Sequence, residues 1–140
     1  MIYVDRTITV QQGSSKINEP VVLYRGDFDV SVRFTIVNSN IKFVSDYNMI
    51  EYEKTPNAQL ILLSQTKEAV FSNIIRCEDG RATFSVPKEI LDELQEPGKY
   101  SFQIRLYDYD MTSRITIPQV KNGIIVREPI VTEGNIVDWG

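Results

Sequence analysis

The sequence predicts an all-β domain, an antiparallel β-sandwich of the immunoglobulin-like or Greek-key type with one short helix near residues 87–95. Hydrophobic residues alternate with polar ones over segments of strand length, which is typical of half-buried strands. Turn-forming residues separate these segments at short intervals, as in sandwiches and barrels. The 140 residues, 42% hydrophobic and 24% charged, are the size and balance of one globular domain.

Two segments show the alternation most clearly. Val30–Ile36 places Val, Val, Phe and Ile on one face, and Tyr100–Leu106 repeats the pattern with Tyr, Phe, Ile and Leu. Further short strands are expected at Thr7–Val10, Val21–Tyr24, Ala58–Leu63, Ser113–Ile117 and Gly123–Val126. Together these segments account for the predicted sandwich.

The dipeptide Asp79-Gly80 predicts a two-residue hairpin turn of type I′, in which both central residues have positive φ. This register sets Glu78 opposite Arg81, Cys77 opposite Ala82 and Ile75 opposite Phe84, within a hairpin spanning Phe71–Val86. It places Cys77 on the inward face and predicts a buried, unreactive thiol. Asn73 also falls on the inward face, which indicates either a bulge or the end of a strand.

The helix is predicted from Pro87 to Gln95, because proline suits a first helical turn, Ile90, Leu91 and Leu94 line one side, and Pro97-Gly98 ends it. The strand pattern stops after Val126, where Arg127-Glu128-Pro129 follows. We therefore expect a sandwich over residues 1–126 and, over residues 127–140, an exit segment that leads to a region outside this chain.

The composition excludes several kinds of chemistry. The chain has no histidine, so catalytic triads and dyads that use histidine, and all histidine-containing zinc sites, are excluded. Its single cysteine forms neither an internal disulfide nor a thiolate cluster. The net charge of −4 argues against nucleic acid as a partner, and no apolar run is long enough to span a membrane. We expect no enzyme activity, no catalytic residues and no cofactor; a hydrolase using two carboxylates is the enzymatic alternative.

Two aspartate pairs are candidates for a calcium site, Asp27 with Asp29 and Asp108 with Asp110. Each pair has carboxylates at i and i+2, which point the same way on an extended backbone, and Ca²⁺ takes its ligands from oxygens of several segments. The alternative is that these loop aspartates bond their own backbone. Arg25-Gly26-Asp27 is also the tripeptide that integrins bind, although a Gly-Asp turn before a strand explains it as well.

The stretch from Val22 to Ile36 resembles the opening of a phage family, the N-terminal domain of the baseplate upper protein of long-tailed phages and prophages of Gram-positive bacteria. The pattern of that family is an apolar pair, a Gly-Asp turn, a few residues and then an alternating strand of the form I-x-F-x-I, to which Val32-Arg33-Phe34-Thr35-Ile36 is similar. Later features follow in the same order, from a strand, a hairpin and a short helix to Pro97-Gly98-Lys99-Tyr100 and a final strand pair. The resemblance spans roughly Ile8–Val126; the polar segment Val44–Thr55 departs from it.

This resemblance implies a virion structural protein of the phage tail baseplate, made in the host cytoplasm. The domain would dock onto the ring of the distal tail protein, and the rest of a longer chain, as a homo-oligomer, would carry receptor-binding proteins. Outward arginines such as Arg33, Arg76 and Arg105 would oppose uncontrolled pairing of strand edges. The alternative is a carbohydrate-binding or adhesion sandwich, in a calcium-dependent or a calcium-independent form.

Loops that combine aromatic and charged residues are the expected contact sites for a partner. These are the Arg25–Asp29 turn, the Tyr107–Asp110 loop and the exit that begins at Arg127. The residues named as partner-binding are Arg25, Asp27, Phe28, Asp29, Tyr107, Tyr109, Asp110 and Arg127.

Overall fold

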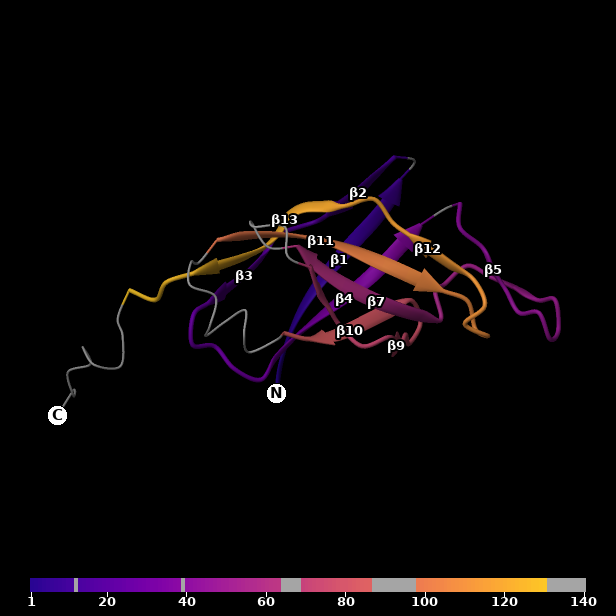
Figure 1. Ribbon diagram of the computed structural model, residues 1–140, viewed down its shortest axis with the longest axis horizontal. Helices are drawn as coiled ribbons and strands as arrows, with labels where there is room; N and C mark the ends of the chain where they lie inside the picture. Colours follow the sequence, from indigo (N-terminus) through magenta and orange to yellow (C-terminus); the bar gives the residue numbers. More distant parts are fainter. Residues whose placement is uncertain (12, 39, 64–68, 87–97, 131–140) are drawn as a thin grey trace.

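The computed structural model describes residues 1–130 except 12, 39, 64–68 and 87–97. These residues form two packed β-sheets, with a small two-stranded hairpin projecting from one end (Figure 1). All described regular structure is strand, so the predicted all-β sandwich is confirmed. The predicted helix over 87–95 lies outside the described residues.

The four-stranded sheet has the order β10-β4-β1-β2, and its strands are β1 (Ile2–Gln11), β2 (Ser14–Ile17), β4 (Val30–Asn38) and β10 (Arg81–Ser85). The main path of the seven-stranded sheet is β3-β13-β11-β7-β8. Its strands are β3 (Val21–Tyr24), β7 (Asn57–Leu63), β8 (Ala69–Phe71), β9 (Ile75–Arg76), β11 (Lys99–Tyr107), β12 (Arg114–Thr116) and β13 (Val120–Arg127). The projecting hairpin pairs β5 (Phe43–Val44) with β6 (Glu51–Tyr52).

The sheets are mixed, which corrects the expectation of purely antiparallel pairing. β1 runs parallel to β4 over nine residue pairs, from Ile2–Val30 to Val10–Asn38, and β3 runs parallel to β13. A parallel pair needs a crossover connection. Here β3 supplies it, because the chain leaves the four-stranded sheet after β2, forms β3 in the other sheet, and returns as β4.

The core lies between the two sheets and is built by the alternation that the sequence shows. Phe34 of β4 and Phe102 of β11 are fully buried and meet across the core with ring centroids 5.1 Å apart. Phe84 of β10 packs on the other side of Phe34, at 6.3 Å. Removing such side chains from water is the main favourable term in folding a domain of this size.

The seven strands expected from alternation and turn spacing are all present, several of them longer than predicted. β1 begins at Ile2 rather than Thr7, because its first residues are held by parallel pairing with β4 and not by burial; Ile2 itself is exposed. β13 begins at Val120, three residues before the predicted start, and its register with β11 shifts between Tyr100 and Phe102.

The Asp79-Gly80 turn is confirmed, but the hairpin expected around it is wrong. Asp79 and Gly80 have φ of 53° and 76°, and Glu78 and Arg81 exchange both backbone hydrogen bonds. Beyond that pair the two arms separate: β9 joins β7 of the seven-stranded sheet, whereas β10 joins β4. Each arm buries its apolar face better against a long neighbouring strand than against the other arm. Asn73 is exposed between β8 and β9, so the end of a strand explains it.

Cys77 is partly buried against the core, and burial raises the pKa of its thiol to about 12. We expect the native protein to react with a thiol reagent at pH 8 at least roughly a hundredfold more slowly than the urea-unfolded chain, because only the thiolate reacts. Absorbance of the released reagent measures both rates. Similar rates for the folded and unfolded chains would show that the thiol is accessible.

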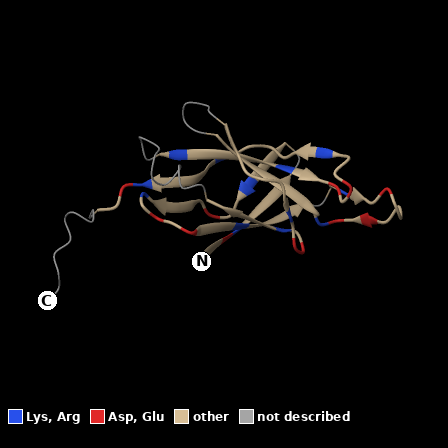
Figure 2. Cartoon of the chain, turned by 60° about the horizontal axis from the view of Figure 1, so that its bottom comes forward, with Lys and Arg blue, Asp and Glu red and all other residues tan. Residues whose placement is uncertain are grey.

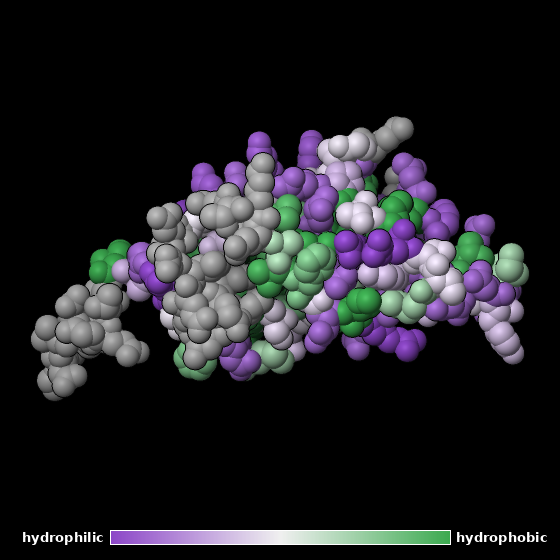
Figure 3. Space-filling view, in the orientation of Figure 1, coloured by the Kyte–Doolittle hydropathy of each residue, from purple (hydrophilic) through white to green (hydrophobic). Residues whose placement is uncertain are grey.

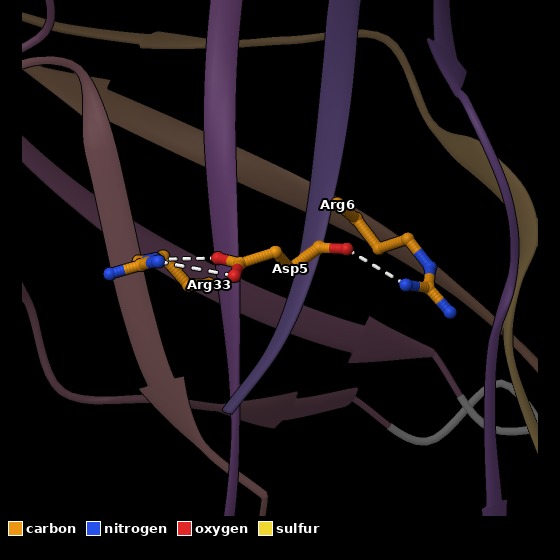
Figure 4. Close-up of polar contacts among 3 residues, drawn as sticks. All are labelled: Asp5, Arg6 and Arg33. Atoms are coloured by element: carbon orange, nitrogen blue, oxygen red, sulfur yellow. Dashed lines mark hydrogen bonds and ion pairs between the residues drawn. The ribbon is translucent and has the colours of Figure 1, made fainter. Parts of the chain in front are cut away.

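The outward face of the four-stranded sheet carries an ion pair between adjacent central strands (Figure 4). Arg33 Nε and Nη2 donate to the two carboxylate oxygens of Asp5 at 2.5 and 3.1 Å, and this hydrogen bonding lowers the pKa of Asp5. Arg33 and Arg105 lie on interior strands, β4 and β11. They therefore do not oppose pairing at a sheet edge, contrary to the expectation from the sequence. Arg76 lies on the short strand β9, off the main path of its sheet.

Candidate functional site: two end surfaces

The turn after β3 is a tight β-turn that fixes the first group of predicted partner-binding residues. Asp27 N–H donates to Tyr24 C=O at 3.0 Å, and Gly26 at the third position has φ of 92°, the arrangement of a type II turn. Asp27 Oδ2 also accepts from Tyr24 N–H at 2.9 Å. The turn interpretation of this tripeptide is therefore confirmed.

Arg25 forms hydrogen bonds with the end of β13 and the residue after it, more than one hundred residues away in sequence. Its backbone N–H donates to Arg127 C=O at 2.8 Å, and its Nη1 donates to Glu128 Oε1 at 2.6 Å. The structure thus brings the predicted turn and the predicted exit together. This happens because β3 pairs in parallel with β13, so both strands end at the same edge of the sandwich.

The start of β1 completes this end of the molecule. The Met1 amino group lies 3.6 Å from Asp29 Oδ2, and Ile2 N–H donates to Asp29 C=O at 3.3 Å. An open groove of about 520 Å³ lies between β1, β3 and the 25–29 turn, with Met1, Ile2, Val22 and Phe28 among its lining residues.

We call this region the exit-end surface. It consists of apolar side chains that are exposed to solvent and of charged residues around them: Met1, Ile2, Val22, Tyr24 and Phe28, with Arg25, Asp27, Asp29, Arg127 and Glu128. Phe28 is 78% exposed and protrudes from the turn. Solvent-exposed apolar groups rimmed by polar ones are typical of protein contact sites.

The second predicted loop, Tyr107–Asp110, follows β11. Because β11 runs antiparallel to β13, this loop lies at the end of the sandwich opposite to the exit-end surface (Figure 1). Tyr107 is only 9% exposed, and its hydroxyl donates to Gln59 Oε1 at 3.1 Å, so its assignment as a partner-binding residue is corrected. The alternation of β11 places Tyr107 on the outward face with Arg105, and Tyr107 is nevertheless buried where β11 pairs with β12 on one side and with β7 on the other.

Asp108 organises the loop that follows β11. Its carboxylate accepts from Thr112 Oγ1 at 2.7 Å, Thr112 N–H at 2.8 Å and Ser113 N–H at 3.2 Å. Burial raises the pKa of Asp108, but these hydrogen bonds outweigh it and the net pKa is lowered. Asp108 therefore bonds its own loop backbone, which was the alternative to calcium binding.

Replacing Asp108 by Asn should destabilise the protein at pH 7 by about 1–3 kcal/mol, since charge-assisted hydrogen bonds become neutral or are lost. A carboxyl group with a lowered native pKa stabilises the fold above its unfolded pKa, and this contribution disappears as pH falls through the native pKa. Urea unfolding of both proteins from pH 7 down to pH 3 should show their difference shrinking below about pH 4. A constant difference across that range would contradict this role.

Tyr109 and Asp110 attach the β5–β6 hairpin to this loop. The rings of Tyr109 and Tyr52 pack with centroids 4.7 Å apart, and Asp110 Oδ2 accepts from Asp46 N–H at 3.1 Å. The base of the hairpin is buried through Phe43 and Thr55, while its tip exposes Tyr47, which is 94% exposed, and Met49. The right-hand end of Figure 3, where the hairpin projects, shows hydrophobic and hydrophilic residues interleaved.

This tip was not among the predicted contact residues. The polar segment Val44–Thr55 had no strand alternation to indicate a structure, and the available signal was Tyr47 and Met49 between charged residues. We call the exposed residues Asp46, Tyr47, Met49, Ile50, Glu51, Tyr109 and Asp110 the hairpin-end surface.

The two aspartate pairs are not arranged as sequence spacing suggested. Asp29 has φ of 54°, so the 27–29 backbone is not extended, and the two carboxylates contact different partners. Across the described residues, no three acidic or cysteine side chains converge in a way that could hold a metal ion. The same part of the chain contains no helix with the length and hydrophobicity needed to cross a membrane.

These features define the class of the molecule as a β-sandwich of two mixed sheets with exposed apolar and charged side chains at each end. The solved structure of the N-terminal domain of phage TP901-1 ORF48 is similar to it, with a TM-score of 0.57 over 91% of this chain and 99% of that one. Sequence identity is 14%, so the likeness establishes a shared fold. No family model matches the sequence, and no curated protein matches it either.

Proposed function

We propose that this chain is the docking domain of a phage baseplate protein, a virion structural component without enzymatic activity. The observation that carries the proposal is the fold match, which spans 99% of the N-terminal domain of phage TP901-1 ORF48 and agrees with the resemblance of Val22–Ile36 to the baseplate upper protein family. The partner would be the ring of the distal tail protein. Segments continuing from the exit would carry receptor-binding proteins in the assembled tail.

The exit-end surface is the proposed contact with the ring. It unites residues from β1, β3, β13 and the 25–29 turn, and its hydrogen bonds and ion pairs hold the turn in one conformation. A preorganised surface loses little conformational entropy on binding. Repetition of such a contact around a ring adds avidity, so each copy needs only a modest affinity.

Phe28 should be the anchor of this contact, because exposed aromatic side chains are frequent interface hot spots. We expect Phe28→Ala to weaken binding to the purified distal tail protein from the same phage or prophage by roughly tenfold or more. Calorimetry or biosensor titration measures the affinity, and thermal unfolding should be unchanged because Phe28 contributes no core packing.

Tyr47→Ala is the matched control, since it also removes an exposed aromatic ring but from the hairpin-end surface. Binding that is insensitive to Phe28→Ala but lost in Tyr47→Ala would move the contact to the opposite end. If the wild-type chain fails to bind the distal tail protein at all, the baseplate role itself is wrong.

A further inference from the structure

The outward face of the seven-stranded sheet is basic, although the chain as a whole has a net charge of −4. The strands of this sheet contain six basic residues and no acidic one. The six are Arg76, Lys99, Arg105, Arg114, Lys121 and Arg127. In Figure 2 the acidic positions lie in turns, in the projecting hairpin and in other strands.

Arg76, Arg105 and Arg114 point to the same side of the sheet because the pairing register aligns them. Tyr107 of β11 pairs with Arg114 of β12 on one flank and with Asn57 of β7 on the other, and Asn57 pairs in turn with Arg76 of β9. Arg76 and Arg114 therefore lie in one row across the sheet. Arg105, two residues from Tyr107, lies in the next row that faces the same way.

None of the six basic residues forms an ion pair with a described residue; the ion pairs of this part of the chain all lie elsewhere. The Arg105 guanidinium lies 5.4 Å from the ring centroid of Phe71, and its buried Nε lacks a hydrogen-bond acceptor among the described residues. A guanidinium in this state retains donors that match the geometry of a carboxylate.

An apolar centre accompanies these charges. Phe71 is 53% exposed at the edge strand β8, next to Ile61, which faces outward in β7 yet is only 5% exposed. Arginine and aromatic residues are enriched in protein interfaces. Nucleic-acid binding to a sheet usually relies on several open aromatic rings for base stacking. Among the described residues of this face the exposed rings are Phe71, one side of which Arg105 occupies, and Tyr24, which lies on the opposite edge strand, β3.

We propose that this face, defined by Arg76, Arg105, Arg114 and Phe71, docks an acidic surface of a partner protein. Carboxylates of the partner would pair with these guanidinium groups, which form no ion pair with a described residue, around the apolar contact at Phe71. Because the interaction depends on the charges of the sheet, it is separate from the exit-end surface and does not require the baseplate role proposed above.

The test uses the full chain with labelled poly-L-glutamate as the acidic protein probe, followed by fluorescence anisotropy at increasing salt. We expect binding that weakens with salt, and a loss of roughly tenfold or more in affinity for the double variant Arg76→Gln with Arg114→Gln. The matched control is Lys16→Gln with Arg81→Gln, which removes two exposed basic charges from the four-stranded sheet. The control should bind as the wild type does.

Arg105→Lys provides a second variant that keeps the charge; it should weaken binding because lysine lacks the planar, bidentate donor pair. Three results would overturn the proposal: equal losses in both double variants, tighter binding to single-stranded DNA of equal charge, or self-association of the chain that poly-L-glutamate does not compete away. The distal tail protein plays no part in this assay, so its outcome is independent of the docking test above.

Discussion

Phe34→Ala should cost about 3–5 kcal/mol of unfolding free energy, the range observed when a large aromatic side chain is removed from a packed core. Phe34 is fully buried, and its ring contacts those of Phe84 in the same sheet and Phe102 in the opposite one. The vacated space lies between two extended sheets whose strands are held by continuous pairing, so the surroundings can collapse only partly. Urea or thermal unfolding measures the loss.

The control for this prediction is Phe28→Ala, which removes the same ring from an exposed position. It should change stability by no more than about 0.5 kcal/mol. A loss below about 1 kcal/mol for Phe34→Ala would mean that the two sheets do not pack through this residue as described. The same pair of variants also separates folding from binding, because Phe28 is the proposed anchor of the ring contact.

Gly123→Ala should destabilise the protein by about 1–3 kcal/mol through overpacking. Gly123 is buried in β13, where the register with β11 shifts. A Cβ at this position would overlap the Phe102 ring and lie 2.9 Å from Val120 Cγ1. Real Cβ atoms do not tolerate such a distance, so the ring or the strand must move.

A double-mutant cycle identifies the cause. If the Phe102 ring is the obstacle, Gly123→Ala should cost less in a Phe102→Leu background than in the wild type. Gly13→Ala is the comparison for a purely conformational cost: Gly13 has φ of 78° and open space around it, so about 1 kcal/mol is expected from the left-handed backbone alone. Additive effects of Gly123→Ala and Phe102→Leu would exclude the steric explanation.

The predicted site was partly recoverable from sequence. Arg25, Asp27, Phe28 and Asp29 form one turn, as the sequence predicts. Arg127 and Glu128 join this turn at the same end, which no local pattern indicates. Met1 and Ile2 were missed, because their role depends on the parallel pairing of β1 with β4.

The Tyr107–Asp110 loop shows the limit of reasoning from residue type. An aromatic residue at a strand end is as consistent with a covered position as with an exposed one, and the neighbouring strands β7 and β12 decide in favour of burial for Tyr107. Asp108 likewise bonds the loop backbone. The hairpin-end surface forms because Tyr109 and Asp110 contact the β5–β6 hairpin, a segment for which the sequence predicts no structure.

The sequence by itself determined the class of fold, the seven main strands, the inward residues of the two with the clearest alternation and the Asp79-Gly80 turn, because side-chain alternation and turn conformation are local properties. Only the tertiary structure decided the partner of each strand, since that choice depends on which neighbour buries an apolar face. It separated β9 from β10 and made β1–β4 and β3–β13 parallel. The absence of histidine and the net charge of −4 describe the composition; the basic sheet face arises from pairing residues far apart in the chain.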